Sequence, residues 1–121
     1  MNQPDFTAEK VPEIPVRIVL KAVAENEAGL CCPVCGSEYV HPLAVIVEQG
    51  HTRTEVKGHG TTVTATDRFC RARGSLVEMA FACEQGHDFR YALEFHKGWI
   101  FLQLAAQPRD PQQPLDELWR N

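Results

Sequence analysis

Two short turns rich in cysteine constrain this chain more than any other feature. Residues 32–36 read CPVCG, and residues 83–87 read CEQGH. Each turn carries two side chains that bind metals as thiolate or imidazole, and each has a glycine that allows the backbone to bend tightly. Three thiolates and one imidazole suit tetrahedral zinc. We therefore predict a zinc site formed by Cys32, Cys35, Cys83 and His87.

The spacing of the cysteines distinguishes between several roles. Five cysteines in 121 residues are compatible with a disulfide framework, but the two-residue gap within CPVCG favours metal binding. The competing interpretation, small buried thiols, is weakened by the presence of two ligand-bearing turns at the ends of predicted strands. A thioredoxin-like redox role is disfavoured because no βαβ pattern follows the motif. Four protein ligands leave no open coordination position, so we predict a structural zinc.

The other cysteines and histidines are placed outside this site. Cys31 can replace Cys32 only with a longer gap to Cys35, and Cys70 lies in a polar stretch before a strand. We expect both to be unligated thiols in the core or at the surface. Of the spare histidines, we expect His41 to lie closest to the metal, as a neighbour of the ligands.

Alternating apolar residues predict a mainly β fold. Apolar side chains recur with period two over 77–82 and again over 89–96. The dipeptide Lys97-Gly98 then predicts a tight hairpin into a third strand over 99–104, because glycine accepts positive φ at no steric cost. We expect these three strands to form an antiparallel meander, in which zinc joins the CPVCG turn to the end of the strand over 75–83.

Further strands are expected upstream of the meander. A stretch rich in Val and Ile predicts a strand that begins after Pro42. Residues 53–56 can pair with residues 63–66 across Lys57-Gly58-His59-Gly60, as an exposed hairpin. Near the amino terminus, β-branched residues over 16–23 favour a strand, although their spacing also suits one face of a helix.

Length and composition favour a single domain. A chain of 121 residues, 44% hydrophobic and 23% charged, has the size and composition of one globular core. We divide it into an N-terminal extension with one strand (1–30), a zinc-binding β domain (31–104) and a proline-rich C-terminal tail (105–121). The sequence has no apolar run of about 18 residues and no signal-peptide pattern at its start, so we expect a soluble, cytoplasmic protein.

The C-terminal tail contains one candidate helical turn. Residues 115–119 can place three apolar side chains on one side of such a turn. These side chains either cover the sheet, which we favour because exposed apolar patches are uncommon on soluble monomers, or contact a partner protein. The candidate partner contacts are Leu115, Leu118 and Trp119.

Charge is distributed unevenly along the chain. The net charge is −4, but residues 51–73 have five basic and two acidic side chains and carry +3, which leaves −7 for the remainder. This segment is the candidate nucleic-acid contact, whereas a solvated loop is the interpretation that we prefer because phosphate-binding domains usually have a clearer basic excess. Its basic side chains are Arg53, Lys57, Arg68, Arg71 and Arg73.

Sequence templates for catalysis do not fit this chain. The metalloprotease motif HExxH, the hydrolase motif GxSxG and the phosphate-binding motif GxxxxGK[ST] are all missing. The His-x-Glu of zinc deaminases is missing too, and Pro33 lies between the two cysteines rather than before them. We therefore expect no enzyme activity.

With CPVCG, CEQGHDF and FHKG in this order, the chain resembles small uncharacterised zinc-ribbon proteins of bacteria and their phages. The resemblance covers about residues 31–104, and the matching positions are Cys32, Cys35, His41, Arg71 to Gly74, Cys83, His87 and His96 to Gly98. It implies a zinc ribbon whose two knuckles are joined by an inserted β region, and it brings no established activity. The extended N-terminal segment, and His87 where many ribbons have cysteine, depart from the pattern.

Zinc ribbons serve in nucleic-acid machinery or as protein-docking modules. We therefore expect a non-enzymatic, zinc-stabilised module that binds another protein through the apolar face or the rim of its sheet. The alternative is a nucleic-acid-binding zinc ribbon that uses the basic segment 51–73.

Overall fold

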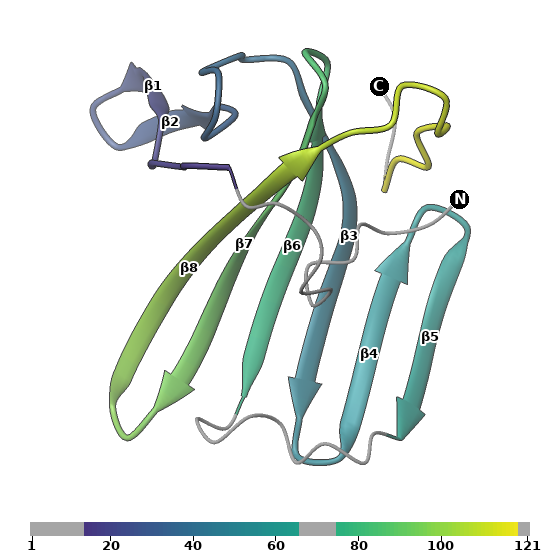
Figure 1. Ribbon diagram of the computed structural model, residues 1–121. Helices are drawn as coiled ribbons and strands as arrows, with labels where there is room; N and C mark the ends of the chain where they lie inside the picture. Colours follow the sequence, from purple (N-terminus) through teal and green to yellow (C-terminus); the bar gives the residue numbers. More distant parts are fainter. Residues whose placement is uncertain (1–13, 66–74, 119–121) are drawn as a thin grey trace.

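The computed structural model describes residues 14–65 and 75–118, and this part of the chain consists of strands and connecting turns (Figure 1). The prediction of a mainly β, antiparallel fold is confirmed. None of the described residues belongs to a helix long and apolar enough to cross a membrane. The strands are β1 (Leu20–Ala24), β2 (Glu27–Leu30), β3 (Val40–Gln49), β4 (Thr52–Lys57), β5 (Gly60–Ala65), β6 (Leu76–Cys83), β7 (His87–His96) and β8 (Trp99–Pro108).

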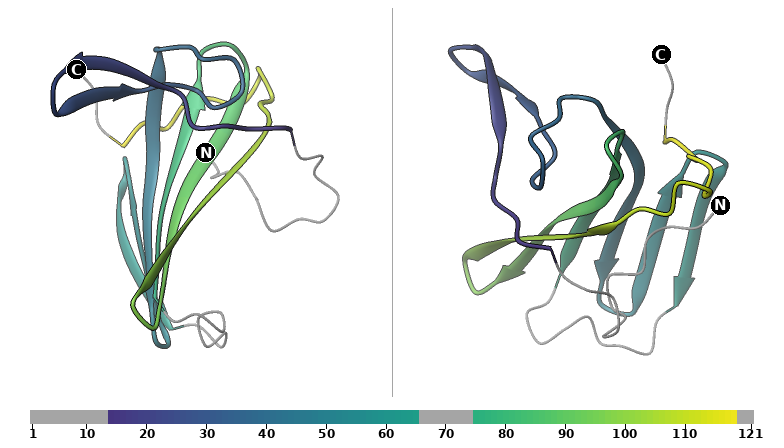
Figure 2. Two further views of the ribbon diagram at one scale, coloured as in Figure 1. Left: turned by 90° about the vertical axis from the view of Figure 1, so that its left-hand side faces the viewer. Right: turned by 45° about the horizontal axis from the view of Figure 1, so that its top comes forward.

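Six of these strands form one large antiparallel sheet in the order β5-β4-β3-β6-β7-β8. Strands β1 and β2 pair separately and stand away from one end of that sheet (Figures 1 and 2). The predicted meander is β6-β7-β8, and the predicted hairpin is β4-β5, in which Thr52 pairs with Ala65. Both predictions are confirmed. The connection from β5 to β6 skips β4 and β3, so the two halves of the sheet meet where β3 pairs with β6.

The two faces of the large sheet differ in chemistry because side chains alternate along each strand. Residues directly opposite one another share a face, so Phe81, Phe89 and Ala106 lie on one face, which we call the apolar face. The same register extends this face through Leu93 and Phe95 of β7. The opposite face, which we call the charged face, carries paired acidic and basic side chains.

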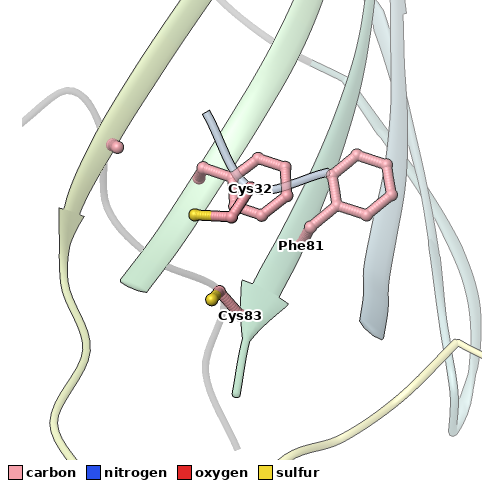
Figure 3. Packing of buried hydrophobic residues seen from close by; sticks show 5 residues of the cluster. Cys32, Phe81 and Cys83 are labelled. Atoms are coloured by element: carbon pink, nitrogen blue, oxygen red, sulfur yellow. The ribbon is translucent and has the colours of Figure 1, made fainter. Parts of the chain in front are cut away.

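One end of the apolar face contains the principal core cluster. Phe81 and Phe89 stack with ring centroids 5.1 Å apart. Cys32 and Cys83 belong to the same cluster and lie near Phe81 (Figure 3). Apolar residues before and within the first cysteine turn pack over this cluster: Ile14, Val16, Leu30 and Val34. Phe89 is fully buried, which contributes about 1.5–3 kcal/mol of hydrophobic stabilisation. The core therefore lies at the end of the sheet that carries the two cysteine turns.

On the charged face, buried carboxylates contact polar or basic side chains of neighbouring strands. Glu48 of β3 is 2% exposed and forms an ion pair with Arg53, its cross-strand partner on β4. Glu94 of β7 is also buried and accepts a hydrogen bond of 2.6 Å from Gln103 of β8. A buried charge without such a partner would be strongly destabilising. Cross-strand pairing therefore allows this face to bury acidic side chains.

The structure corrects three details of the predicted strands. Residues 16–23 do not form a single strand, because β1 begins at Leu20 and turns at residues 25–26 into β2. β2 is short and lacks alternation, so the sequence carried no signal for it. β3 begins at Val40, and Pro42 lies inside it next to a register irregularity, a position in which strands accept proline. β8 continues to Pro108, four residues beyond the predicted strand end at Leu104.

The helical turn predicted over residues 115–119 is not observed over residues 115–118, and Trp119 lies outside the described residues. This segment instead contacts β3 and the β4-β5 turn. The amide of Leu118 donates a hydrogen bond of 2.7 Å to the carbonyl of Pro42, and Asp116 contacts His59 at 3.0 Å. Backbone and carboxylate contacts, rather than helix formation, therefore hold the end of the described chain.

Candidate metal centre

The structure brings the four predicted ligands together. The ligand atoms of Cys32, Cys35, Cys83 and His87 all lie within 4.8 Å of one another. The Sγ atoms of Cys35 and Cys83 are 3.5 Å apart, and Cys32 Sγ lies 3.8 Å from Nδ1 of His87. Residues 48 positions apart in sequence thus form one compact group that can hold a metal ion.

The first pair of ligands lies on a tight turn between β2 and β3. The amide of Val34 points to the Sγ of Cys32 at 3.4 Å, and the amide of Gly36 donates to the carbonyl of Cys32 at 2.9 Å. Gly36 has a φ of 80°, which a residue with a Cβ adopts only at a cost. The turn therefore places Cys32 and Cys35 side by side and directs a backbone amide at a sulfur.

The second pair lies on the turn between β6 and β7 and repeats this geometry. Cys83 ends β6 and His87 begins β7, and the two residues are cross-strand partners. The amide of Gln85 points to Cys83 Sγ at 3.2 Å, and Gly86 has a φ of 100°. In both turns the amide two residues after the first cysteine points to its sulfur, so each turn favours a thiolate there.

Backbone contacts hold the two turns against each other. Val40 of β3 pairs with Cys83 of β6, so the strand that leaves the first turn runs beside the strand that leads into the second. The amide of Glu84 also donates to the carbonyl of Tyr39 at 3.1 Å. The sheet therefore sets the separation of the two turns.

Burial differs among the four ligands and shifts their pKa values. Cys32 and Cys83 are buried, whereas Cys35 is exposed and His87 is half-buried. Burial raises the pKa of Cys83 to about 12, against the opposing effect of the Gln85 amide. Burial also acts to raise the pKa of Cys35, but the backbone of Ser37 and the neighbouring thiols outweigh it, so this pKa lies below its ordinary value. A cation in the group would compensate the cost of ionising Cys83.

An open groove borders the group on the side of Cys35 and His87. Tyr39 and Gln85 line it, together with Glu38. The groove gives solvent direct access to Cys35 and His87, whereas the other two candidate ligands, Cys32 and Cys83, are buried. It therefore provides an entry path for a metal ion.

A buried ion pair supports the second turn, and the sequence did not predict it. Asp88 directly follows His87, and its carboxylate accepts a hydrogen bond of 2.7 Å from Arg109. Both side chains are less than a tenth exposed. The Arg109 amide also donates to the carbonyl of Gly86 at 2.9 Å. Arg109 thus contacts the residues on both sides of His87, although no periodic pattern in the sequence marks it.

His41 lies near the metal group but contacts a neighbour of a ligand rather than a ligand. Its Nε2 is 2.7 Å from a carboxylate oxygen of Glu84, the residue after Cys83, and its Nδ1 is 2.8 Å from Glu117. Burial lowers the pKa of His41, but the hydrogen bonds with Glu84 and Glu117 outweigh this effect, so the pKa is raised. His41 therefore joins the second turn to the C-terminal segment.

The two cysteines predicted to be unligated and the candidate partner contacts differ in burial. Cys31 is buried outside the metal group, as predicted, with its Sγ 3.8 Å from the carbonyl of Gly29, whereas Cys70 lies outside the described residues. Leu115 is 37% exposed, and Leu118 is half-buried.

The basic segment is described only in part. Arg53 pairs with Glu48 and Glu55, and Lys57 lies 3.4 Å from Glu55. The charges of these two residues are therefore neutralised locally. The other three candidate contacts, Arg68, Arg71 and Arg73, lie outside the described residues.

Comparison with known proteins finds no match: no protein-family model, no curated protein and no solved structure is significantly similar to this chain. The resemblance to zinc-ribbon proteins therefore remains an expectation from three short motifs.

Proposed function

We propose that this protein is a zinc-stabilised module that binds another protein and performs no catalysis. The metal is zinc and its role is structural. The large sheet serves as the docking surface. The observation that carries the docking part is a strip of exposed apolar side chains on the same face as the metal group. We place the module in the cytoplasm, because thiolate ligands persist in a reducing compartment.

The distances within the group support zinc. A tetrahedral zinc with zinc–sulfur bonds of about 2.3 Å separates two sulfur ligands by about 3.8 Å. The Sγ atoms of Cys35 and Cys83 are 3.5 Å apart, and Cys32 Sγ is 3.8 Å from the His87 nitrogen, so little movement is needed to accept the ion. Three thiolates with one imidazole are also a common ligand set of structural zinc sites.

The surroundings of the ligands support a structural role for the metal. Four protein ligands complete a tetrahedral zinc and leave no position for a reacting water. Cys32 and Cys83 also belong to the core cluster that contains Phe81 and Phe89, so zinc binding and core packing are coupled. Two amide-capped turns at strand ends support the proposal that the site is a zinc ribbon with an inserted β region, which would comprise β4 and β5.

The docking part of the proposal rests on the far end of the apolar face. Four large side chains there form adjacent cross-strand pairs between β7 and β8, and we call this group the apolar shelf. Contiguous exposed apolar side chains are typical of protein-interaction sites. The shelf consists of Leu93 paired with Leu102 and Phe95 paired with Ile100, with exposed fractions of 37%, 45%, 36% and 61%.

Nucleic-acid binding receives no comparable support from the described residues. Arg53 and Lys57 already contact carboxylates, which reduces their availability for phosphate. The alternative through segment 51–73 therefore stays a prediction, to be tested by binding at two salt concentrations.

The metal assignment is tested by elemental analysis and by cobalt substitution. Protein purified without chelator should contain one equivalent of zinc. Replacement by Co²⁺ should give the visible absorption bands of a tetrahedral thiolate site. Protein that folds without any transition metal would contradict the assignment.

The docking assignment is tested by comparing the proteins that co-purify with the wild-type chain and with two variants. The double substitution Phe95→Ser and Leu102→Ser removes the centre of the apolar shelf, whereas Val63→Ser removes an exposed apolar side chain at the other end of the sheet. We expect the shelf variant to lose its partner and the Val63→Ser control to retain it, with zinc content unchanged in both. Equal recovery of partners by all three proteins would contradict the proposal.

A further inference from the structure

Strand β8 forms one edge of the large sheet and is unusually unprotected. Its ten residues, from Trp99 to Pro108, include no charged side chain, and its proline is the last residue. Natural proteins usually protect sheet edges with lysine, proline, bulges or covering segments, because an open edge pairs readily with another strand. The opposite edge, β5, is also uncharged, but Val63 is its only large exposed apolar side chain.

The outward-facing backbone groups of β8 follow from its pairing with β7. The two-residue turn makes His96 and Trp99 the first cross-strand pair, so the residues that bond to β7 alternate from Trp99 onward. The intervening residues then direct their N–H and C=O groups away from the sheet; these are Ile100, Leu102, Leu104 and Ala106. An observed bond agrees with this alternation, because the carbonyl of Ala106 accepts a hydrogen bond of 3.4 Å from the amide of Ile14.

The contact of Ile14 with Ala106 also demonstrates how this edge is used. An extended segment of the chain contacts the edge through its backbone while the Ile14 side chain packs against the core cluster. Within residues 14–65 and 75–118, no corresponding backbone bond reaches β8 from Trp99 to Leu104. As far as the described residues go, the same kind of contact is therefore open along the half of β8 next to the apolar shelf.

The free half of the edge and the apolar shelf are continuous. Ile100 and Leu102 have outward-facing backbone groups and also belong to the shelf. In an antiparallel pair, a residue opposite Ile100 or Leu102 points its side chain to the same face. Alternate side chains of an added strand would therefore cover the shelf, while its backbone completes the edge.

The positive charge of Lys97 indicates which end of an added strand would be acidic. Lys97 forms the turn at the start of β8, and among the described residues it has no ion pair. An antiparallel strand added to β8 would end beside this turn. An acidic side chain near its carboxyl end would complement Lys97, whereas the uncharged strand β8 offers nothing for charged residues further along.

A second copy of the chain fits this edge less well. A two-fold arrangement centred on Leu102 would place residue 98 of one copy opposite Ala106 of the other. That position is already occupied by Ile14. In this register the edge is therefore better suited to a short extended segment of a different protein, which need not reach Ala106.

We propose that the free edge of β8 from Ile100 to Leu104 binds an extended segment of another protein as a seventh strand of the sheet, with apolar side chains at alternate positions and an acidic carboxyl end. This inference rests on the proposed docking function and names its mode and the chemistry of its partner. The alternate side chains of the partner segment provide specificity, and its backbone hydrogen bonds align it with β8.

The test uses the zinc-loaded full chain and a synthetic peptide of alternating threonine and valine with two aspartates at its carboxyl end. Amide exchange followed by NMR should slow at Leu102 and Leu104 by about tenfold or more when the peptide is saturating, because these amides gain partners. The amides of Phe101 and Gln103 bond to β7 in both states and serve as internal controls. Replacing both aspartates by lysine should weaken binding, and Lys97→Glu should restore it.

N-methylated peptides separate strand addition from simple apolar contact. Valines that face the shelf also direct their amides at β8, so N-methylation of the valines should abolish binding. N-methylation of the threonines, whose amides face away, should leave binding intact. Equal binding of the two peptides, or no binding of the parent peptide, would overturn the proposal.

Two further outcomes overturn the inference while leaving the docking function untouched. One is a peptide that shifts the signals of Leu93 and Phe95 without slowing amide exchange at Leu102 and Leu104. The other is sedimentation of the chain as a dimer that Leu102→Lys dissociates, since the occupant would then be a second copy. Loss of natural partners in the Phe95→Ser and Leu102→Ser variant tests the docking function separately.

Discussion

The guanidinium of Arg109 donates a hydrogen bond of 2.7 Å to the carboxylate of Asp88, the residue that directly follows the metal-ligand candidate His87. The same guanidinium also donates to the carbonyls of Gln113 and Pro114. One buried side chain therefore connects the second turn of the metal centre to the C-terminal segment. Burial raises the pKa of Asp88, and the charge of Arg109 opposes this rise.

Arg109→Met should be strongly destabilising. The substitution leaves Asp88 buried without its partner, and the loss of one member of a buried pair costs about 3–5 kcal/mol. Urea unfolding of the zinc-loaded protein measures this free energy. Adding Asp88→Asn to the variant should recover part of the loss, because the buried charge is then removed.

A matched control for this prediction is Lys21→Met. Lys21 pairs with Glu38 at 2.9 Å, but both side chains are more than half exposed. Such surface pairs contribute about 0–1 kcal/mol. Similar losses in the two variants would contradict the supporting role of Arg109.

Cys83→Ser should abolish metal binding and cooperative unfolding together. Structural zinc contributes about 10–16 kcal/mol at neutral pH, which equals or exceeds the stability of a typical domain. Cys31→Ser is the control, because Cys31 is a buried thiol that does not belong to the ligand group. Metal content and thermal unfolding measure both effects, and one equivalent of zinc retained by Cys83→Ser would refute the site.

Gly58→Ala should displace the C-terminal segment from the β4-β5 turn. A Cβ at this position would collide with the backbone carbonyl oxygen of Glu117. A backbone atom cannot rotate aside as the end of a flexible side chain can. We expect a loss of about 1–3 kcal/mol and a changed NMR signal for the Leu118 amide. Gly29→Ala is the control, because its Cβ would meet only Lys21 O at an ordinary 3.8 Å.

The contacts of His41 should make stability depend on pH. Its pKa is raised above the ordinary 6.5 because hydrogen bonds with Glu84 and Glu117 outweigh the effect of burial. The stabilisation is therefore complete below about pH 6.5 and is lost as the pH rises through the raised pKa of the folded protein.

Two variants test this dependence. His41→Gln should flatten the fall in the free energy of unfolding above pH 6.5, and Glu117→Gln should lower the pKa of His41 measured by NMR. A folded-state pKa of His41 below the ordinary value would show that burial dominates instead.

Much of the β structure could be predicted because its signals are local. The alternation over β6 and β7 and the Lys97-Gly98 turn fixed the meander, since each strand and turn is encoded by neighbouring residues. The β1-β2 hairpin was missed because its strands are short, exposed and without alternation. The helical turn expected near Leu115 is not observed over residues 115–118, where the amide of Leu118 bonds instead to the carbonyl of Pro42, a residue distant in sequence.

The sequence by itself determined the two halves of the metal centre, because each half is a turn of five residues whose thiols, imidazole and glycine act locally. Only the tertiary structure decided that the halves meet, through the pairing of Val40 with Cys83. It alone decided that Arg109 neutralises Asp88 and that, among the described residues, the side chains of the apolar shelf stay exposed. Contacts between distant residues depend on strand order and register, and no periodicity within a single segment encodes these.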